Sequence, residues 1–113
     1  MNNNPSHAVV YYDKKKAGIL SKTSAGYKFT YDPVYLTDPN VMPISLGMPL
    51  RPEKYESKNL FPFFDGLLPE GWLLDLICAA AKIDKNDGFG LLLHTGQDPI
   101  GAVSILPIKD NNG

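Results

Sequence analysis

The hydrophobic period of the chain changes near residue 59, and this change constrains the fold more than any other feature. Before it, apolar residues come in short β-branched and aromatic runs or alternate with polar ones, as strands require. After it, they recur at spacings of three and four, as one face of a helix requires. A last apolar run over 102–106 has strand character again. This order predicts an α+β fold, with a mostly antiparallel sheet packed against two or three short helices.

Three strands are predicted in the first third of the chain, over 8–12, 17–21 and 27–31. In the last of these, three aromatic residues share one face because strand side chains alternate: Tyr27, Phe29 and Tyr31. The polar residues 13–16, three of them lysines, predict a solvated hairpin tip between the first two strands.

The stretch between the strands and the helices is harder to interpret, because prolines interrupt it. Residues 34–36 predict one helical turn. Residues 43–50 alternate in polarity between prolines and predict an edge strand or an extended segment. The polar residues 51–58 predict a surface loop.

Three helices are predicted in the second half, over 60–68, 72–82 and 88–94. Asn59 is a suitable N-cap for the first, and Pro69 suits the first position of a new helix. The second helix has four apolar residues at helical spacing as its predicted buried stripe: Leu73, Leu76, Ile77 and Ala80. Asp87 is expected to cap the third helix and Gly96 to end it.

The length and charge of the chain restrict its class. With 113 residues, we expect a single domain over 1–113, with an ordered core over about 8–107 and polar tails. The balance of 11 Lys+Arg against 12 Asp+Glu disfavours direct binding of nucleic acid. One cysteine excludes an internal disulfide, and no apolar run reaches the roughly 20 residues that span a bilayer. No membrane association is predicted, and a cytoplasmic location is expected.

No group of residues has the pattern of an active site. His7 is expected in the N-terminal tail and His94 at a helix end, where a histidine usually interacts with the helix dipole. Cys78 stands among alanines and is interpreted as a small buried apolar residue. Asp65 and Glu70 are interpreted as helix-end charges. We therefore expect no catalytic residue, no metal site and no cofactor, and the chain is not expected to be an enzyme.

Trp72 is the single tryptophan, and it directly follows Pro69-Glu70-Gly71 at the start of the second helix. It lies about 100° from Leu73 around the helix axis. Spacing alone leaves two interpretations open. The indole either borders the core or projects from the helix start as an anchor for a partner protein.

Three motifs, taken in order, resemble the HipA family of toxin kinases. Residues 63–71, FFDGLLPEG, are similar to an FFDNLLP(E/D)G segment in the N-terminal subdomain of these kinases. Residues 87–92, DGFGLL, and 96–107, GQDPIGAVSILP, are similar to the next two elements of that subdomain. The resemblance extends over about residues 8–107 and covers nearly the whole chain.

The resemblance implies a role through a partner. Kinases of this family continue past the subdomain into an ATP-binding core, whereas this sequence ends soon after Pro107. It thus resembles the small separate subunit of bacterial HipBST toxin–antitoxin systems. The implied function is an antitoxin that inhibits a HipT-type Ser/Thr kinase toxin by docking where the fused subdomain sits. A HipB-type DNA-binding protein is implied as a further partner.

The resemblance favours partner anchoring for Trp72. The implied contact surface is the corner before and at the second helix, made of Asp65, Leu68, Pro69, Glu70, Gly71 and Trp72. A glycine there permits close approach of a partner. The alternative is that the sequence is the N-terminal structural subdomain of a full-length HipA-like kinase, which it supports in cis.

Overall fold

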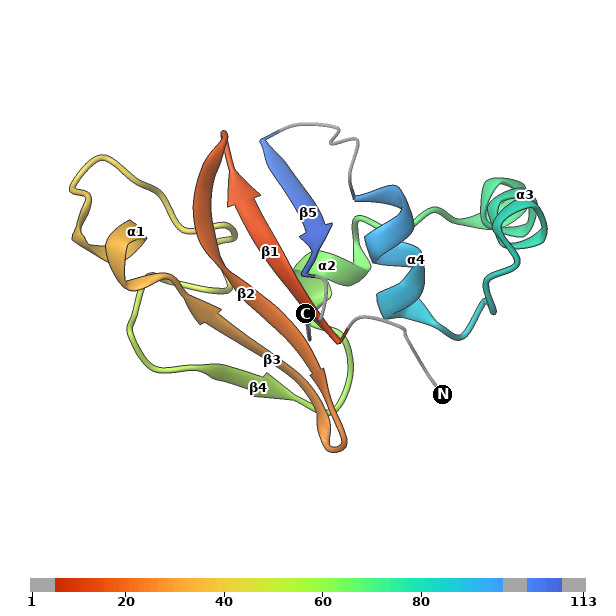
Figure 1. The fold of residues 1–113 in the computed structure, drawn as a ribbon, viewed down its shortest axis with the longest axis horizontal. Coiled ribbons are helices and arrows are strands. Elements are labelled where there is room, and N and C mark those ends of the chain that lie inside the picture. The colour runs from red at the N-terminus through yellow and green to blue at the C-terminus, as the bar shows by residue number, and fades with distance from the viewer. Residues whose placement is uncertain (1–5, 97–101, 109–113) are drawn as a thin grey trace, which may run out of the picture.

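The computed structural model describes residues 6–96 and 102–108. The elements follow one another as β1 (His7–Tyr12), β2 (Lys15–Thr23), β3 (Gly26–Tyr31), α1 (Pro33–Thr37), β4 (Tyr55–Ser57), α2 (Pro62–Asp65), α3 (Gly71–Ala81), α4 (Gly88–Thr95) and β5 (Val103–Pro107). The strands form one antiparallel sheet in the order β4-β3-β2-β1-β5 (Figure 1). The predicted α+β class is confirmed. The predicted polar tail over 109–113 lies outside the described residues.

The hairpin between β1 and β2 is tighter than the sequence indicated. Its turn is Asp13-Lys14, with φ of +51° and +72°, and β2 already begins at Lys15. Two successive residues with positive φ form the kind of turn whose twist matches that of paired strands. The usual Asn-Gly or Asp-Gly pair is missing, and Asp and Lys adopt this backbone here instead.

The closing strand β5 pairs with β1, so the two ends of the described chain are neighbours in the sheet. Gly96, at the end of α4, accepts a hydrogen bond from the Ile105 N–H at 2.9 Å. A Cβ on Gly96 would lie 2.6 Å from the Leu92 carbonyl oxygen and 3.0 Å from Ile105 Cβ. Gly96 ends α4 as predicted, but with φ of −74°, so close packing and not a left-handed backbone requires this glycine.

The core lies on one face of the sheet. Phe29 on β3 packs against the Phe64 ring of α2, with centroids 5.9 Å apart, and edge-on against Tyr31 at 4.9 Å. Helix α4 adds buried apolar side chains from the same side: Phe89, Leu91, Leu92 and Leu93. Its N-cap is Asp87, whose carboxylate accepts the Gly90 N–H at 2.9 Å. The predictions for α4 are confirmed.

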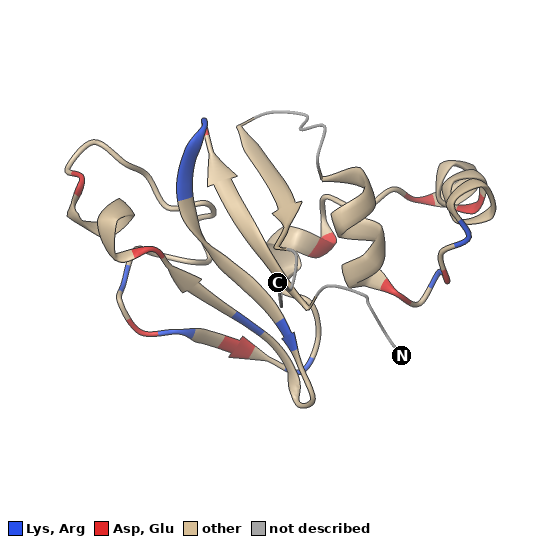
Figure 2. Cartoon of the chain, viewed as in Figure 1, with Lys and Arg blue, Asp and Glu red and all other residues tan. Residues whose placement is uncertain are grey.

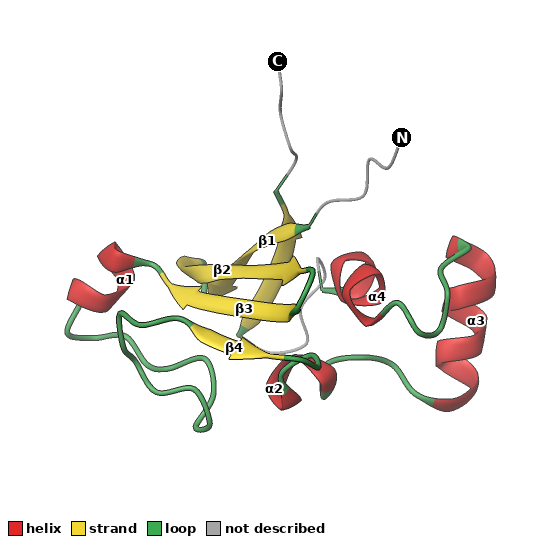
Figure 3. Cartoon of the chain, turned by 90° about the horizontal axis from the view of Figure 1, so that it is seen from below, coloured by secondary structure: helices red, strands yellow, loops and turns green. Residues whose placement is uncertain are grey.

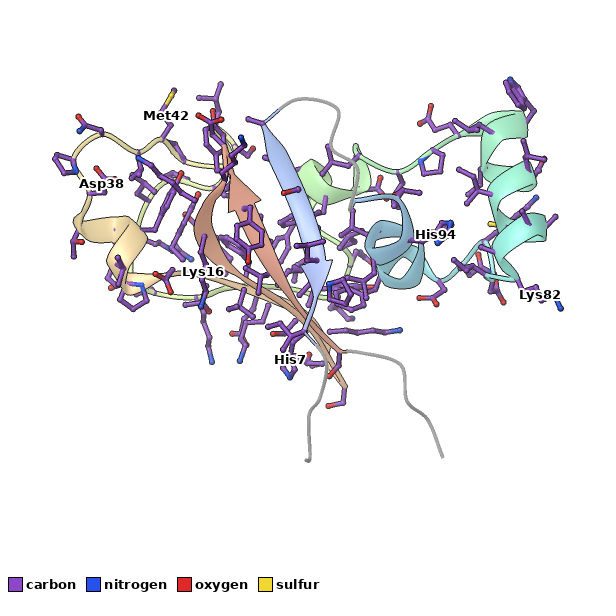
Figure 4. The ribbon with its side chains drawn as sticks, turned by 45° about the horizontal axis from the view of Figure 1, so that its top comes forward. His7, Lys16, Asp38, Met42, Lys82 and His94 are labelled. Atoms are coloured by element: carbon purple, nitrogen blue, oxygen red, sulfur yellow. The ribbon has the colours of Figure 1, made fainter. Side chains whose placement is uncertain are left out.

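The prediction of an edge strand over 43–50 is wrong. The segment is irregular and turns between Ser45 and Met48, whose N–H donates to the Ser45 carbonyl at 3.0 Å. The edge strand beside β3 is β4, which lies inside the stretch predicted as a surface loop. Pro43 and Pro49 cannot donate to a strand ladder, and side chains of the sheet bind the backbone of this loop instead. Figure 4 shows Asp38 and Met42 on the first part of this long connection.

Helix α2 is much shorter than the predicted helix over 60–68. It spans four residues, and its N-cap is Phe61 with no side-chain hydrogen bond, so Asn59 is not the cap. The chain leaves the helix at Gly66. After it, the Leu68 N–H donates to the Asp65 carbonyl at 3.1 Å, a tightened turn that leads into the corner.

Candidate partner-binding site

The corner that the sequence singled out joins α2 to α3. Leu68 is half-buried against the core, and Pro69 is also half-buried. Glu70 is the N-cap of α3 with an extended backbone, so Pro69 precedes the helix and does not begin it. Gly71 follows with φ of +60° and no atom within 4 Å of where a Cβ would be. This glycine is needed for its left-handed backbone, because its surroundings are open.

Helix α3 stands away from the rest of the protein. In both Figure 1 and Figure 3 it lies at one end of the molecule, with α4 between it and the sheet. None of its residues is buried. Trp72, at its first turn, is 76% exposed. In this structure the indole is therefore not part of the core, and the interpretation of Trp72 as a core residue is wrong.

The predicted buried stripe of α3 is also wrong. Leu73 is 42% exposed and Leu76 is 56% exposed, and Ala80 is exposed as well. The half-buried face is shifted by about one position around the helix: Leu74, Ile77, Cys78 and Ala81. Asp75 is the only charged residue in α3. A helix that is apolar on nearly every side normally lies inside a protein. The exposure of α3 therefore makes it a candidate contact surface.

An ion pair joins α3 to the loop that follows it. Lys85 Nζ lies 2.7 Å from an Asp75 carboxylate oxygen. The hydrogen bond and charge of Asp75 raise the pKa of Lys85 above its ordinary value. Both side chains are more than half exposed, so this pair contributes little to stability. The position of α3 is thus held mainly by its connections at both ends.

The other residues that were considered for chemistry lie apart from one another. His7 is the first residue of β1 and not part of a free tail, and its Nδ1 lies 2.7 Å from Ser21 Oγ in a hydrogen bond. His94 lies on α4, and Figure 4 shows the two histidines in separate parts of the fold. Cys78 is half-buried and reduced, where a buried residue was expected. Within residues 6–96 and 102–108, no group of three or more His, Cys, Asp or Glu could hold a metal ion.

The sequence patterns did not predict two apolar features of the surface. One is the exposure of α3, for which the single charge in eleven helical residues was an available signal. The other is a set of exposed apolar side chains outside the core. Leu46, in the loop before β4, is 97% exposed, and Leu106, on β5, is 39% exposed. No helix in the described part of the chain is long and apolar enough to cross a membrane.

Comparison with known proteins agrees with the fold. The solved structure of an N-terminal domain of HipA toxin superposes with a TM-score of 0.71 and 28% identity, covering 98% of this chain and 100% of that chain. The fold is therefore that of a HipA-type N-terminal domain. Residues 8–106 match the family of the HipA N-terminal domain, and this chain belongs to that family.

Two relatives differ in how much of them this chain covers. A protein of Haemophilus influenzae, described only as uncharacterized, is 38% identical over 88 residues, which are 78% of this chain and 79% of that protein. A protein of Sinorhizobium fredii named "Putative kinase Y4mE" is 32% identical over 99 residues. Those residues are 87% of this chain but only 24% of the Sinorhizobium protein. The same domain thus occurs in a short relative and as about a quarter of a long one.

Proposed function

We propose that this protein is a HipS-type antitoxin, which binds and inhibits a HipT-type Ser/Thr kinase toxin. It docks where the fused N-terminal subdomain sits in a full-length HipA kinase. The observation that carries the proposal is the exposed apolar helix α3, with Trp72 76% exposed directly after the family motif. Large aromatic side chains on such surfaces are typical anchors in protein interfaces.

The corner supplies the contact surface in this proposal. Trp72 inserts toward the active-site cleft of the kinase, and Gly71 lets the two backbones approach closely. Leu68 packs against the core and Pro69 is half-buried, and Asp65 and Glu70 add exposed carboxylates. Inhibition then follows because the indole occupies space that the kinase needs for its substrates.

The charge distribution supports this orientation. Residues 59–96 carry two lysines against five Asp and Glu, whereas residues 1–58 carry eight Lys and Arg against five Asp and Glu. Figure 2 shows the positions of the acidic residues, coloured red, along and between α2, α3 and α4. A cleft that binds the phosphates of ATP is basic, so an acidic surface steers the helical end of this protein toward it.

The two relatives support a domain that works both fused and separate. The Haemophilus relative is itself short, because 88 aligned residues make up 79% of it. A HipB-type DNA-binding protein is the proposed third component, and the complex is cytoplasmic. This chain itself contributes neither catalysis nor direct contacts to nucleic acid.

A second candidate function rests on the Sinorhizobium relative, of which the matched region is 24%. In this alternative the sequence is the N-terminal structural subdomain of a full-length HipA-like kinase and supports that kinase in cis. A neighbouring gene for a kinase that lacks this domain distinguishes the two, since it is required only for the antitoxin.

The test is co-expression with the HipT-type kinase of the same genome, scored by growth rescue and by co-purification. The wild-type chain is expected to restore growth and to copurify. Trp72→Ala is expected to lose both. Leu46→Ala is the matched control, because it also removes an exposed apolar side chain, at 97% exposure, outside the corner. Absence of rescue and of a complex with the wild-type chain would contradict the proposal.

A further inference from the structure

The face of the sheet that points away from the core carries an apolar row. Paired residues in neighbouring antiparallel strands lie on the same face. Val9 pairs with Ile19 of β2 on one side and with Leu106 of β5 on the other. These three side chains therefore lie side by side across three strands. Their strand neighbours Ala8 and Val10 are fully buried on the opposite face.

Two further apolar residues extend this row. Tyr11 lies two residues further along β1 on the same face, and Ile108 follows β5, where its N–H donates to the His7 carbonyl at 2.9 Å. We call these five residues the open-face patch: Val9, Tyr11, Ile19, Leu106 and Ile108. Leu106 is 39% exposed and the other four are half-buried. The solvated face of an antiparallel sheet normally carries polar side chains, so this patch is unusual for a surface in water.

The charges beside the patch are balanced within the sheet. Lys16 lies 3.6 Å from an Asp32 carboxylate oxygen. Lys28 stands directly opposite Glu56 in the pairing of β3 with β4. The remaining paired positions on this face are one histidine, whose Nδ1 lies 2.7 Å from Ser21 Oγ in a hydrogen bond, and three hydroxyl residues: His7, Ser21, Thr30 and Ser104. The surface that fits here is therefore apolar and uncharged, and a nucleic acid or a strongly charged peptide does not match it.

The size of the patch argues against a second copy of this chain as the occupant. Three strands at about 4.8 Å spacing and about five residues at 3.3 Å give only a few hundred Å². A stable interface buries roughly 800 Å² on each partner. The patch therefore fits as one part of a larger interface.

The path of the chain in longer relatives identifies the occupant. The domain is the N-terminal one of its family, and it makes up 24% of the Sinorhizobium relative, so the remainder of such proteins follows β5. Leu106 lies on β5 and Ile108 directly after it, which places the start of that remainder beside the open-face patch. In Figure 1, β5 is also the strand nearest α4, beyond which α3 lies.

We infer that the open-face patch is a second docking surface for the same kinase partner, where it receives an apolar, uncharged surface of that protein. This inference rests on the proposed antitoxin function. It extends the contact from the corner at Trp72 across the β5 side of the molecule. The kinase then covers two apolar surfaces that the described residues leave wholly or partly exposed.

The test compares two triple variants by calorimetric titration with the purified HipT-type kinase. Val9→Thr/Ile19→Thr/Leu106→Thr removes the apolar row and keeps strand-forming residues. It is expected to raise Kd by roughly tenfold or more. The matched control is Val34→Thr/Met42→Thr/Leu46→Thr, at 75%, 60% and 97% exposure outside the patch. Its Kd is expected to stay within about twofold of the wild-type value.

Each outcome decides between the two proposals. If the wild-type chain binds and the open-face variant binds equally well, the inference is overturned and the antitoxin function stands. If the wild-type chain does not bind, both are overturned. If thermal melting shows that the triple variant is unfolded, Leu106→Thr alone replaces it. This exposed position is expected to raise Kd by about threefold or more, and an unchanged Kd overturns the inference.

Discussion

The hydroxyl of Tyr31 on β3 donates a hydrogen bond to the backbone carbonyl of Met48, and so ties the sheet to the long loop before β4. The same oxygen accepts the Ile44 N–H at 3.1 Å. Tyr35 and Tyr55 act alike, because their hydroxyls donate to other carbonyls of this loop at 2.5 and 2.6 Å. Three phenols from three different elements thus provide hydrogen bonds where the prolines of this loop prevent a strand ladder.

Replacing Tyr31 by Phe is expected to destabilise the protein by about 1–3 kcal/mol, because a buried N–H and a buried carbonyl lose their partner. Urea unfolding measures the change, and limited proteolysis should show faster cleavage between residues 38 and 54. Tyr11→Phe is the control, since that ring is on the opposite face of the sheet; it is expected to change stability by less than about 0.5 kcal/mol. Equal stability of Tyr31→Phe and wild type would refute this role.

The stability of the protein is expected to fall at alkaline pH. Burial raises the pKa of Tyr31 from 10.0 to about 12, and burial also raises the pKa of Tyr35. In the unfolded chain these phenols ionise near their ordinary pKa, so the unfolded state loses protons first. The stabilisation is complete below pH 10 and is lost as pH rises from 10 toward 12. The melting temperature measured as a function of pH tests this loss of stability. In Tyr31→Phe the melting temperature should fall less between pH 10 and 12 than in the wild type. An equal fall in both proteins would mean that other groups cause the alkaline loss of stability.

Alanine substitution is expected to change the stability of the protein strongly at one glycine and hardly at another. A Cβ on Gly18 would lie 2.4 Å from the Thr30 carbonyl oxygen and 2.7 Å from Phe29 Cζ. Gly18→Ala is therefore expected to cost about 1–3 kcal/mol, because the backbone and the packed ring must move. For Gly47 the nearest atom would be Ser45 Oγ at 3.8 Å, so Gly47→Ala should be nearly neutral. Thermal melting compares the pair, and similar effects of both substitutions would count against the close approach at Gly18.

Trp72 offers a direct optical test of the corner, since it is the only tryptophan in the chain. At 76% exposure, its emission is expected to resemble that of a tryptophan amide in water and to be quenched readily by iodide. Trp72→Ala should leave the melting temperature unchanged, because little packing is lost. Emission at shorter wavelength with protection from iodide would instead place the indole in an apolar environment.

The regular strands could be predicted from the sequence because their signals are local. Tyr27, Phe29 and Tyr31 alternate with polar residues, and period 2 alone puts them on one face. The edge strand could not be predicted in this way. Tyr55–Ser57 is too short and polar to carry a period, and it becomes a strand only because β3 presents an open edge. Residues 43–50 do alternate in polarity as a strand would, but backbone groups of this segment form hydrogen bonds with the hydroxyl of Tyr31, which is distant in sequence.

The position of the corner between two helices was predicted from the sequence, whereas the exposure of α3 was not. The motif over 63–71 marks the corner, and Asp65, Leu68 and Glu70 lie along it as expected. The burial of Leu73 and Leu76 was predicted from spacing, which reports how residues share a helix face and not what that face contacts. Helix α3 is placed by the corner and by the loop to α4, so its packing depends on both.

The sequence by itself determined the class of the fold, the strands of the first third, the capped helix α4 and the position of the corner, because these depend on periodicity and on residues close together along the chain. Only the tertiary structure decided that Trp72 is exposed and that Val9, Ile19 and Leu106 form a row on the open face. The physical reason is that exposure depends on which surfaces other parts of the chain cover. A sequence pattern shows that a surface is apolar, and the fold decides whether that surface is left for a partner.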